Sequence, residues 1–321
     1  MNGLGHATVF APAKVNPSLI VLGKRPDGYH EVDTTLVALD LGDRLTLSVV
    51  PEAGPDIALT VSGPLASADV PRDGRNLAVR ALVAARDLLV AEVPSLAAAR
   101  LELHLEKHVP SQAGLGGGSS DAAAAVRALE VAVGARIAPA ARAALLARLG
   151  ADCAFFGAAE ATGAGRARGF GESVAPLPAP RAWSVVVVTP SAVCPTGSIY
   201  AALQFPLEAA PEVDLAELLT RPADAARAAL FNHLERAALR AVPALAPWRA
   251  LFDDLARTED PRAGTFRLSG SGSSWFTLVA GRAEGAALLD RVRAGARRRA
   301  LDLRGAWVTQ PAGPYGLRPC A

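Results

Sequence analysis

The segment Pro110-Ser-Gln-Ala-Gly114-Leu-Gly116-Gly117-Gly118-Ser119-Ser120-Asp121 has four glycines in five positions. Glycine allows backbone amides to approach an anion without obstruction by a Cβ atom. The N-terminus of a following helix adds unpaired N–H groups and the positive end of the helix dipole. The segment is therefore interpreted as a phosphate-binding loop. The residues expected to bind the phosphates are Gly114, Leu115, Gly116, Gly117, Gly118, Ser119 and Ser120.

This loop differs from two common nucleotide-binding motifs. No Gly-Lys-Ser/Thr sequence closes it, so it is not a Walker A loop. Ser119 stands where a dinucleotide fingerprint has its third glycine. The alternative interpretation is a flexible turn between a strand and a helix, with Ser120 as an ordinary N-cap.

A second loop rich in glycine and serine covers residues 268–274 and contains Gly270 and Gly272. Small residues permit close approach to a ligand or to the first loop. On its own this pattern is weak, because most such loops are turns. Two glycine-rich loops in one chain favour a shared nucleotide site.

Hydrophobic patterns outward from the first loop predict an α+β fold. Alternation at 45–49 and 101–105 predicts half-buried strands, and the β-branched run 183–188 predicts a central strand. Helices are expected at 76–92, with Asn76 as the cap, and from about Ser120 to Gly134. The second half predicts three helices and three strands. The helices are expected at 214–220, 223–241 and 284–299, and the strands at 266–269, 275–280 and 307–310.

Glycine and proline are frequent between residues 163 and 180, which indicates a domain junction. We expect an N-terminal domain of residues 1–165 that holds the phosphate loop and the catalytic residues. Residues 166–321 are expected to form a second domain that completes the cleft. A chain of 321 residues with 51% hydrophobic residues is long enough for two such cores.

Composition argues against several functional classes. Lys plus Arg total 33 and Asp plus Glu total 31, so no net field attracts nucleic acid or an anionic membrane. The basic run at 291–299 is expected to be a solvated helix face. The three cysteines, Cys153, Cys194 and Cys320, are too few for a disulfide framework. Without a signal or membrane segment in the sequence, we expect a cytoplasmic protein with small-molecule substrates and no obligate protein partner.

A lysine and an aspartate are candidates for the chemistry itself. Lys14 lies beside a proline in Ala11-Pro-Ala-Lys14-Val-Asn16, and Asp152 follows Gly150. An aspartate that faces a transferring phosphate can accept a hydroxyl proton, and a lysine can keep that aspartate ionised. A surface lysine and a helix-terminal aspartate remain the alternative from the residues alone.

Five segments resemble, in chain order, those of the 4-diphosphocytidyl-2-C-methyl-D-erythritol kinase family, which belongs to the superfamily of galactokinase, homoserine kinase, mevalonate kinase and phosphomevalonate kinase. The three superfamily motifs alone would indicate only a kinase of this fold, whereas Arg25-Pro-Asp-Gly-Tyr-His30 is characteristic of the diphosphocytidyl family. The resemblance spans residues 11–274, which is most of the chain. Its segments are 12–16, 23–31, 114–121, 150–152 and 268–272.

The resemblance implies transfer of the ATP γ-phosphate to the 2-hydroxyl of the cytidyl-linked methylerythritol of the non-mevalonate isoprenoid pathway. Asp152 would be the general base and Lys14 its partner, and Mg²⁺ would accompany ATP without an assigned protein ligand. The implied fold is a domain like the second domain of ribosomal protein S5, followed by a ferredoxin-like domain.

The resemblance also assigns roles around the reacting groups. Tyr29 would stack on cytosine and His30 would hydrogen-bond to it, with Tyr200 in the Thr196-Gly-Ser-Ile-Tyr200 segment as a lid. Asn16 would bind near the reacting alcohol. Two further residues would serve the nucleotide, Lys107 by reaching it and Asn76 by lying near the adenine.

Three departures from the family pattern concern the fit of the substrate more than kinase chemistry. Pro17-Ser18 replaces apolar residues and predicts a bend near Asn16, His233 replaces an aspartate, and Cys153-Ala154 replaces Val-Pro. Asp121 is expected to point away from the phosphates. The alternatives are another kinase of the superfamily, an inactive nucleotide-binding homologue and, more remotely, a dehydrogenase.

Overall fold

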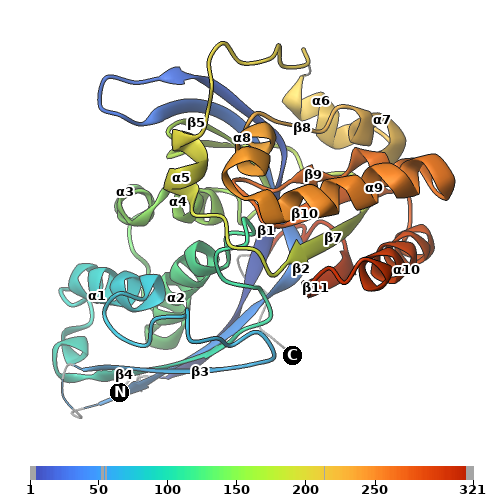
Figure 1. Cartoon of the computed structure of the whole chain (residues 1–321). Coiled ribbons are helices and arrows are strands. Elements are labelled where there is room, and N and C mark those ends of the chain that lie inside the picture. The colour runs from blue at the N-terminus through green and yellow to red at the C-terminus, as the bar shows by residue number, and fades with distance from the viewer. Residues whose placement is uncertain (1–4, 52–53, 55, 213, 316–321) are drawn as a thin grey trace.

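The computed structural model describes residues 5–51, 54, 56–212 and 214–315, which form a mixed α+β fold with two sheets (Figure 1). The first sheet has the strand order β3-β4-β2-β1-β8, with β5 attached to β2 and β6 attached to β5. The second has the order β11-β7-β10-β9. In the described part of the chain, no helix has the length and apolar character needed to cross a membrane.

A long antiparallel hairpin of β1 (His6–Lys24) and β2 (His30–Val50) runs through the molecule (Figure 1). One half of β2 pairs with β4 (Arg100–Glu106), which in turn pairs with β3 (Ile57–Ser62). The other half pairs with β5 (Ala164–Gly169), and β5 pairs with β6 (Ser173–Pro176). The first sheet therefore continues past residue 165.

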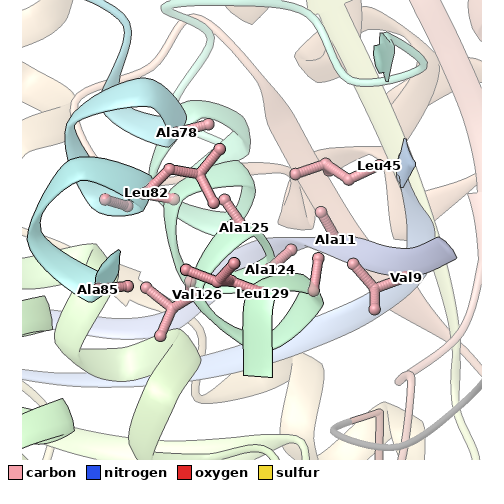
Figure 2. Close-up of a cluster of buried hydrophobic side chains, with 14 of the residues drawn as sticks. Val9, Ala11, Leu45, Ala78, Leu82, Ala85, Ala124, Ala125, Val126 and Leu129 are labelled. Atoms are coloured by element: carbon pink, nitrogen blue, oxygen red, sulfur yellow. The ribbon is translucent and has the colours of Figure 1, made fainter. Parts of the chain in front are cut away.

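Helix α2 (Gly117–Val133) packs against the β1–β2 hairpin, and helix α1 (Leu77–Leu89) packs against α2 (Figure 2). Small side chains on α2, among them Ala124 and Ala125, let it approach α1 and the sheet closely. Leu82 of α1 and Leu45 of β2 fill the space around them. The alanine-rich sequence after the glycine loop is thus a buried helix face, and α2 is held firmly at its N-terminus.

Helices cover one face of the second sheet, which comprises β7 (Ser184–Pro190), β9 (Arg267–Leu268), β10 (Trp275–Val279) and β11 (Leu303–Thr309). Val186 and Val188 face a core shared with α9 (Ala246–Thr258) and α10 (Arg282–Arg298). Val185 and Val187 face a core shared with β1 and β2. Burial of both faces explains the unbroken β-branched run.

The remaining elements are short or connect the larger ones. Two helices, α3 and α4, follow α2, and α5 lies near the hairpin tip (Figure 1). Their bounds are α3 (Pro139–Leu149), α4 (Ala151–Ala158), α5 (Thr196–Ala201), α6 (Leu215–Thr220), α7 (Ala223–Ala228), β8 (Phe231–Asn232) and α8 (Leu234–Ala241). Three 3-10 turns lie at Pro94–Ala98, Pro243–Leu245 and Pro261–Thr265.

Several predicted elements are confirmed. Asn76 caps α1, because its side chain accepts a hydrogen bond from the amide of Ala78. The alternating segments lie in β2 and β4, and β7 is an interior strand. The helix expected at Ser120 begins three residues earlier, at Gly117, because Gly116 adopts the left-handed conformation and serves as the cap.

The single helix expected at 223–241 is wrong. The chain forms α7, then the two-residue strand β8, and then α8. Phe231 and Asn232 pair in parallel with Ser18 and Leu19 of β1. Alanine, leucine and arginine fit a helix throughout this segment, so only the tertiary pairing with β1 shows the break. The strand expected at 307–310 begins earlier, at Leu303, and α9 was not anticipated.

His233 fixes the start of α8 to β1. Its Nδ1 accepts a hydrogen bond of 2.9 Å from the amide of Val21, and Nε2 lies 3.0 Å from the carbonyl oxygen of Glu208. Nδ1 therefore carries no proton and Nε2 donates. This bond to a buried amide is one that an aspartate or asparagine oxygen can also make.

We expect His233→Leu to lower the free energy of unfolding by about 1–3 kcal/mol, because it leaves the buried amide of Val21 without an acceptor. His233→Asn is the matched control. Its side-chain oxygen can take the place of Nδ1, so it should lose markedly less stability. Urea unfolding followed by circular dichroism measures both, and equal losses would contradict this role of His233.

Candidate active site

A cleft of about 520 Å³ lies where the phosphate loop, β1, the start of α4 and the 268–274 loop meet. The hairpin strand β2 and the segment before α5 complete its walls. Twelve of the residues singled out from the sequence line it. They are Lys14, Asn16, Gly114, Gly116, Gly117, Gly118, Ser119, Asp152, Thr196, Tyr200, Gly270 and Gly272.

The phosphate loop has a backbone that only glycine adopts readily. Gly114 has φ +76° and Gly116 has φ +71°. The amide of Ser120 makes the first bond of α2, to the carbonyl oxygen of Gly116. The amides of Gly117, Gly118 and Ser119 have no partner within the helix, and these residues line the cleft. The end of α2 is therefore suited to an anion.

The two glycine-rich loops are in direct contact. A Cβ atom on Gly114 would lie 2.1 Å from the carbonyl oxygen of Ser269. Ser269 donates its hydroxyl to the carbonyl oxygen of Gly114 at 2.8 Å, and the amide of Ser274 donates to the carbonyl oxygen of Ala113 at 3.0 Å. The second loop thus supports the first and contributes Gly270 to the cleft.

Lys14 and Asp152 meet beside these loops. The Lys14 Nζ lies 3.5 Å from Asp152 Oδ2 and donates a hydrogen bond of 2.8 Å to Asn16 Oδ1. The lysine side chain is 4% exposed, whereas that of Asp152 is 36% exposed. Asp152 lies in the first turn of α4, where the helix dipole favours its negative charge. One carboxylate oxygen is thus held by a buried cation while the group remains open to a ligand.

The orientation of Asn16 is fixed by Thr34. Its Nδ2 donates to Thr34 Oγ1 at 2.9 Å, and Thr34 donates to the carbonyl oxygen of Ser18 at 2.7 Å. The expected irregularity at Pro17-Ser18 is a register shift between Val15 and Ser18, and β1 continues through it. Proline fits there because it has no N–H to pair.

Aromatic rings gather on two sides of the cleft. Tyr29, at the hairpin tip, has its ring centroid 5.3 Å from that of Phe170. His30 stacks on Tyr200 at 5.1 Å and on Phe205 at 6.3 Å. Tyr29 and His30 are not wall residues of the cleft, but their ring partners Phe170 and Tyr200 are.

The protonation states of His30 and Tyr200 suit a neutral ligand. Burial, followed by the positive charge of Lys24, lowers the pKa of His30, so the neutral imidazole dominates at neutral pH. Burial, followed by the negative charge of Asp152, raises the pKa of Tyr200 to about 12. Its phenol therefore remains a hydrogen-bond donor.

Besides Tyr29 and His30, four candidate residues lie outside the walls of the cleft. Leu115 and Ser120 are buried, and the carbonyl oxygen of Leu115 accepts a hydrogen bond of 2.9 Å from the amide of Lys14. Asn76 is engaged as the cap of α1. Lys107 is buried, and its ammonium donates to Asp43 and Asp121. Asp121 therefore faces Lys107.

Several further wall residues were not predicted from the sequence. Phe170 stands between two glycines, a context that signals an exposed aromatic ring, whereas the others have no local signal. They include Thr34, Gln112, Cys194 and Ser271. Cys153 and Cys194 are free and buried, and burial raises each thiol pKa to about 11, so both are unreactive. Cys320 lies outside the described residues.

Gly114→Ala is expected to lower the free energy of unfolding by about 2–4 kcal/mol, because the new Cβ meets backbone and the residue is strained at positive φ. Gly118→Ala is the control. Its Cβ would find only Leu77, at 3.9 Å, and it should keep or gain stability. Thermal unfolding measures both variants. Equal stability of the two would contradict the close packing of the loops.

Comparison with known proteins gives consistent matches. A family model described as GHMP kinases N terminal domain matches residues 76–160. A 4-diphosphocytidyl-2-C-methyl-D-erythritol kinase of Dinoroseobacter shibae is 39% identical over 271 residues, covering 84% of each chain. One of Caulobacter vibrioides is 38% identical over 290 residues, covering 89% of this chain and 94% of that protein.

Solved structures agree with these relatives. A crystal structure of a 4-(cytidine 5'-diphospho)-2C-methyl-D-erythritol kinase is 34% identical with a TM-score of 0.68, and the match covers 95% of this chain and 100% of that one. A homoserine kinase of Cytophaga hutchinsonii, 17% identical, has a TM-score of 0.69 over 97% of this chain and 96% of its own, and shows a common fold. The chain belongs to the GHMP kinases and, within them, to the family of 4-diphosphocytidyl-2-C-methyl-D-erythritol kinases.

Proposed function

We infer that this chain transfers the γ-phosphate of ATP to the 2-hydroxyl of 4-diphosphocytidyl-2-C-methyl-D-erythritol, a step of the non-mevalonate route to isoprenoids. The observation that carries this inference is a single cleft that combines a phosphate loop with the Lys14–Asp152 pair. Relatives that bear this kinase name over most of their length support it.

Asp152 is proposed as the general base. Phosphoryl transfer has a loose transition state, so positioning and charge stabilisation matter more than a strong base. The partly exposed carboxylate of Asp152 accepts the hydroxyl proton, while Lys14 pairs with this carboxylate and stabilises charge on the transferred group. Asn16, oriented by Thr34, keeps the ammonium in place.

The amides at the start of α2 are proposed to hold the ATP phosphates, with Gly270 close by on the second loop. Mg²⁺ prefers oxygen ligands, usually keeps several waters and binds to substrate phosphates. The Ser119 hydroxyl is an oxygen donor in the cleft wall and would suit such an ion. When bound with ATP, Mg²⁺ offsets the phosphate charge. No group of three or more metal-binding side chains occurs in the described ranges.

Cytosine is proposed to bind between the two aromatic groups. Tyr29 and Phe170 offer ring faces on one side, and Tyr200 with His30 offers a face and neutral hydrogen-bonding nitrogens on the other. Thr196 joins α5 to the second loop, because its hydroxyl lies 3.0 Å from Ser271 Oγ. Nucleobases stack on aromatic rings because every base presents a π-face, which agrees with this arrangement.

The finer description of the fold belongs to the same proposal. Residues 1–165 would form a domain like the second domain of ribosomal protein S5, and residues 166–321 a ferredoxin-like domain that completes the cleft. The second part would also contribute β6 and β8 to the sheet of the first. Wall residues from both parts, among them Lys14 and Tyr200, support a shared cleft. A cytoplasmic location and small-molecule substrates without an obligate protein partner complete the proposal.

Asp152→Asn should lower kcat for the cytidyl substrate by about 10²–10⁴-fold, because a general base contributes that much, while Mg-ATP binding stays near the wild-type value. An assay of ADP release with purified protein measures the rate, and calorimetry measures ATP affinity. Homoserine and mevalonate serve as control acceptors. Turnover confined to either of them would show that this acceptor, and not the cytidyl compound, is the substrate. Full activity of Asp152→Asn would show that Asp152 is not the general base.

Phe170→Leu and Tyr29→Leu should each raise KM for the cytidyl substrate by about 5–150-fold, the equivalent of ~1–3 kcal/mol of base stacking, with little change in KM for ATP. Leucine keeps apolar bulk but removes the ring face. Val193→Leu, an exposed apolar residue that is not part of the cleft wall, is the control. Equal increases in both KM values would contradict a role in holding the base.

A further inference from the structure

Asp43 is a buried carboxylate beside the entry of the phosphate loop, and no role in the reaction proposed above uses it. It lies in β2 with no exposed surface. Its Oδ1 accepts hydrogen bonds from the amides of His108 at 2.5 Å and Val109 at 2.8 Å. Its Oδ2 accepts one from the Lys107 ammonium. One side chain thus fixes three consecutive residues between β4 and the loop.

Lys107 carries this restraint to α2. Its ammonium also donates to Asp121 Oδ2 at 2.8 Å, and Asp121 lies in the early turns of that helix. A Cβ on Gly117, the first residue of α2, would lie 3.4 Å from Lys107 Nζ and 3.1 Å from a methyl group of Val109. The residues held by Asp43 are therefore packed against the helix end whose amides face the cleft.

Charge balance makes Asp43 the principal ionic partner of Lys107. Burial, opposed by Lys107 and reinforced by the charge of Asp43, raises the pKa of Asp121 to about 8. Asp121 Oδ1 is buried without a hydrogen-bond partner, whereas each oxygen of Asp43 is bonded. A buried ammonium needs a partner whose own polar atoms are hydrogen-bonded, and Asp43 meets this requirement.

We propose that Asp43 is a positioning residue of the nucleotide site, which sets the place of the loop entry and, through Lys107, of the first residue of α2. The inference rests on the proposed role of this loop in holding the ATP phosphates. It also changes the role expected of Lys107. With its ammonium shared between two buried carboxylates, Lys107 acts on the nucleotide through the backbone that it braces.

Asp43→Asn tests the proposal. The asparagine oxygen can still accept from the two amides, but its NH₂ group faces the ammonium of Lys107, so the link to α2 is lost. Calorimetry on the full chain measures Kd for Mg-ADP and, separately, for the cytidyl substrate. We expect Kd for Mg-ADP to rise about tenfold, the loss of roughly one charge-assisted hydrogen bond, with the cytidyl Kd within about twofold of wild type.

Asp33→Asn is the matched control. Asp33 is another largely buried carboxylate of β2 that pairs with arginine, with Arg166 and Arg168 as its partners, and it lies far from the loop along the strand. Its Kd for Mg-ADP should stay at the wild-type value. If Asp43→Asn fails to fold, Asp121→Leu removes the acceptor on the side of α2 and breaks the same link, and a rise of about threefold or more in Kd for Mg-ADP supports the proposal.

Three results would overturn it. Equal weakening of Mg-ADP and the cytidyl substrate would reduce Asp43 to a general role in stability, as would lower thermal stability with an unchanged Mg-ADP affinity. If Asp43→Asn does not fold, an unchanged Kd for Mg-ADP in Asp121→Leu would also overturn it. A wild-type chain that does not bind Mg-ADP would remove the nucleotide site itself, which is a separate and recognisable failure.

Discussion

The close approach of two backbones at Gly114 and Ser269 is the constraint on which the cleft depends. No Cβ fits between them, and hydrogen bonds on either side join the two loops. One loop belongs to the first sheet and its helices, the other to the second sheet. Their contact brings the start of α2 and the 268–274 loop to a common anion site, which neither sheet can build alone.

Buried charges around this contact are each held by neighbours. Lys14 is supported by Asn16 and Asp152, and Lys107 is supported by Asp43 and Asp121. The two lysines differ in how far their carboxylate partners are exposed to the cleft. Beside Lys14 a carboxylate reaches the cleft, whereas the partners of Lys107 are enclosed. The first pair is therefore suited to chemistry and the second to holding structure.

The long β1–β2 hairpin connects the residues proposed for the reaction to those proposed for binding the substrate. Lys14 and Asn16 lie along β1, and Tyr29 lies at the tip, where Phe170 packs on its ring. A departure from the family pattern, His233, ties α8 to the same strand through the amide of Val21. An aspartate oxygen could accept the same hydrogen bond, so histidine at this position replaces one acceptor with another.

The glycine-rich loop, the candidate pair Lys14 and Asp152, and the main strands could be predicted from the sequence, because glycine content, period-two alternation and motif order are local properties. The family followed from those motifs. Three features are visible only in the folded chain: β8 interrupts a helical pattern, Phe170 faces Tyr29, and Asp43 and Asp121 enclose the Lys107 ammonium. Each of these depends on residues far apart in the chain, whose contacts arise from packing and charge compensation that no local pattern records.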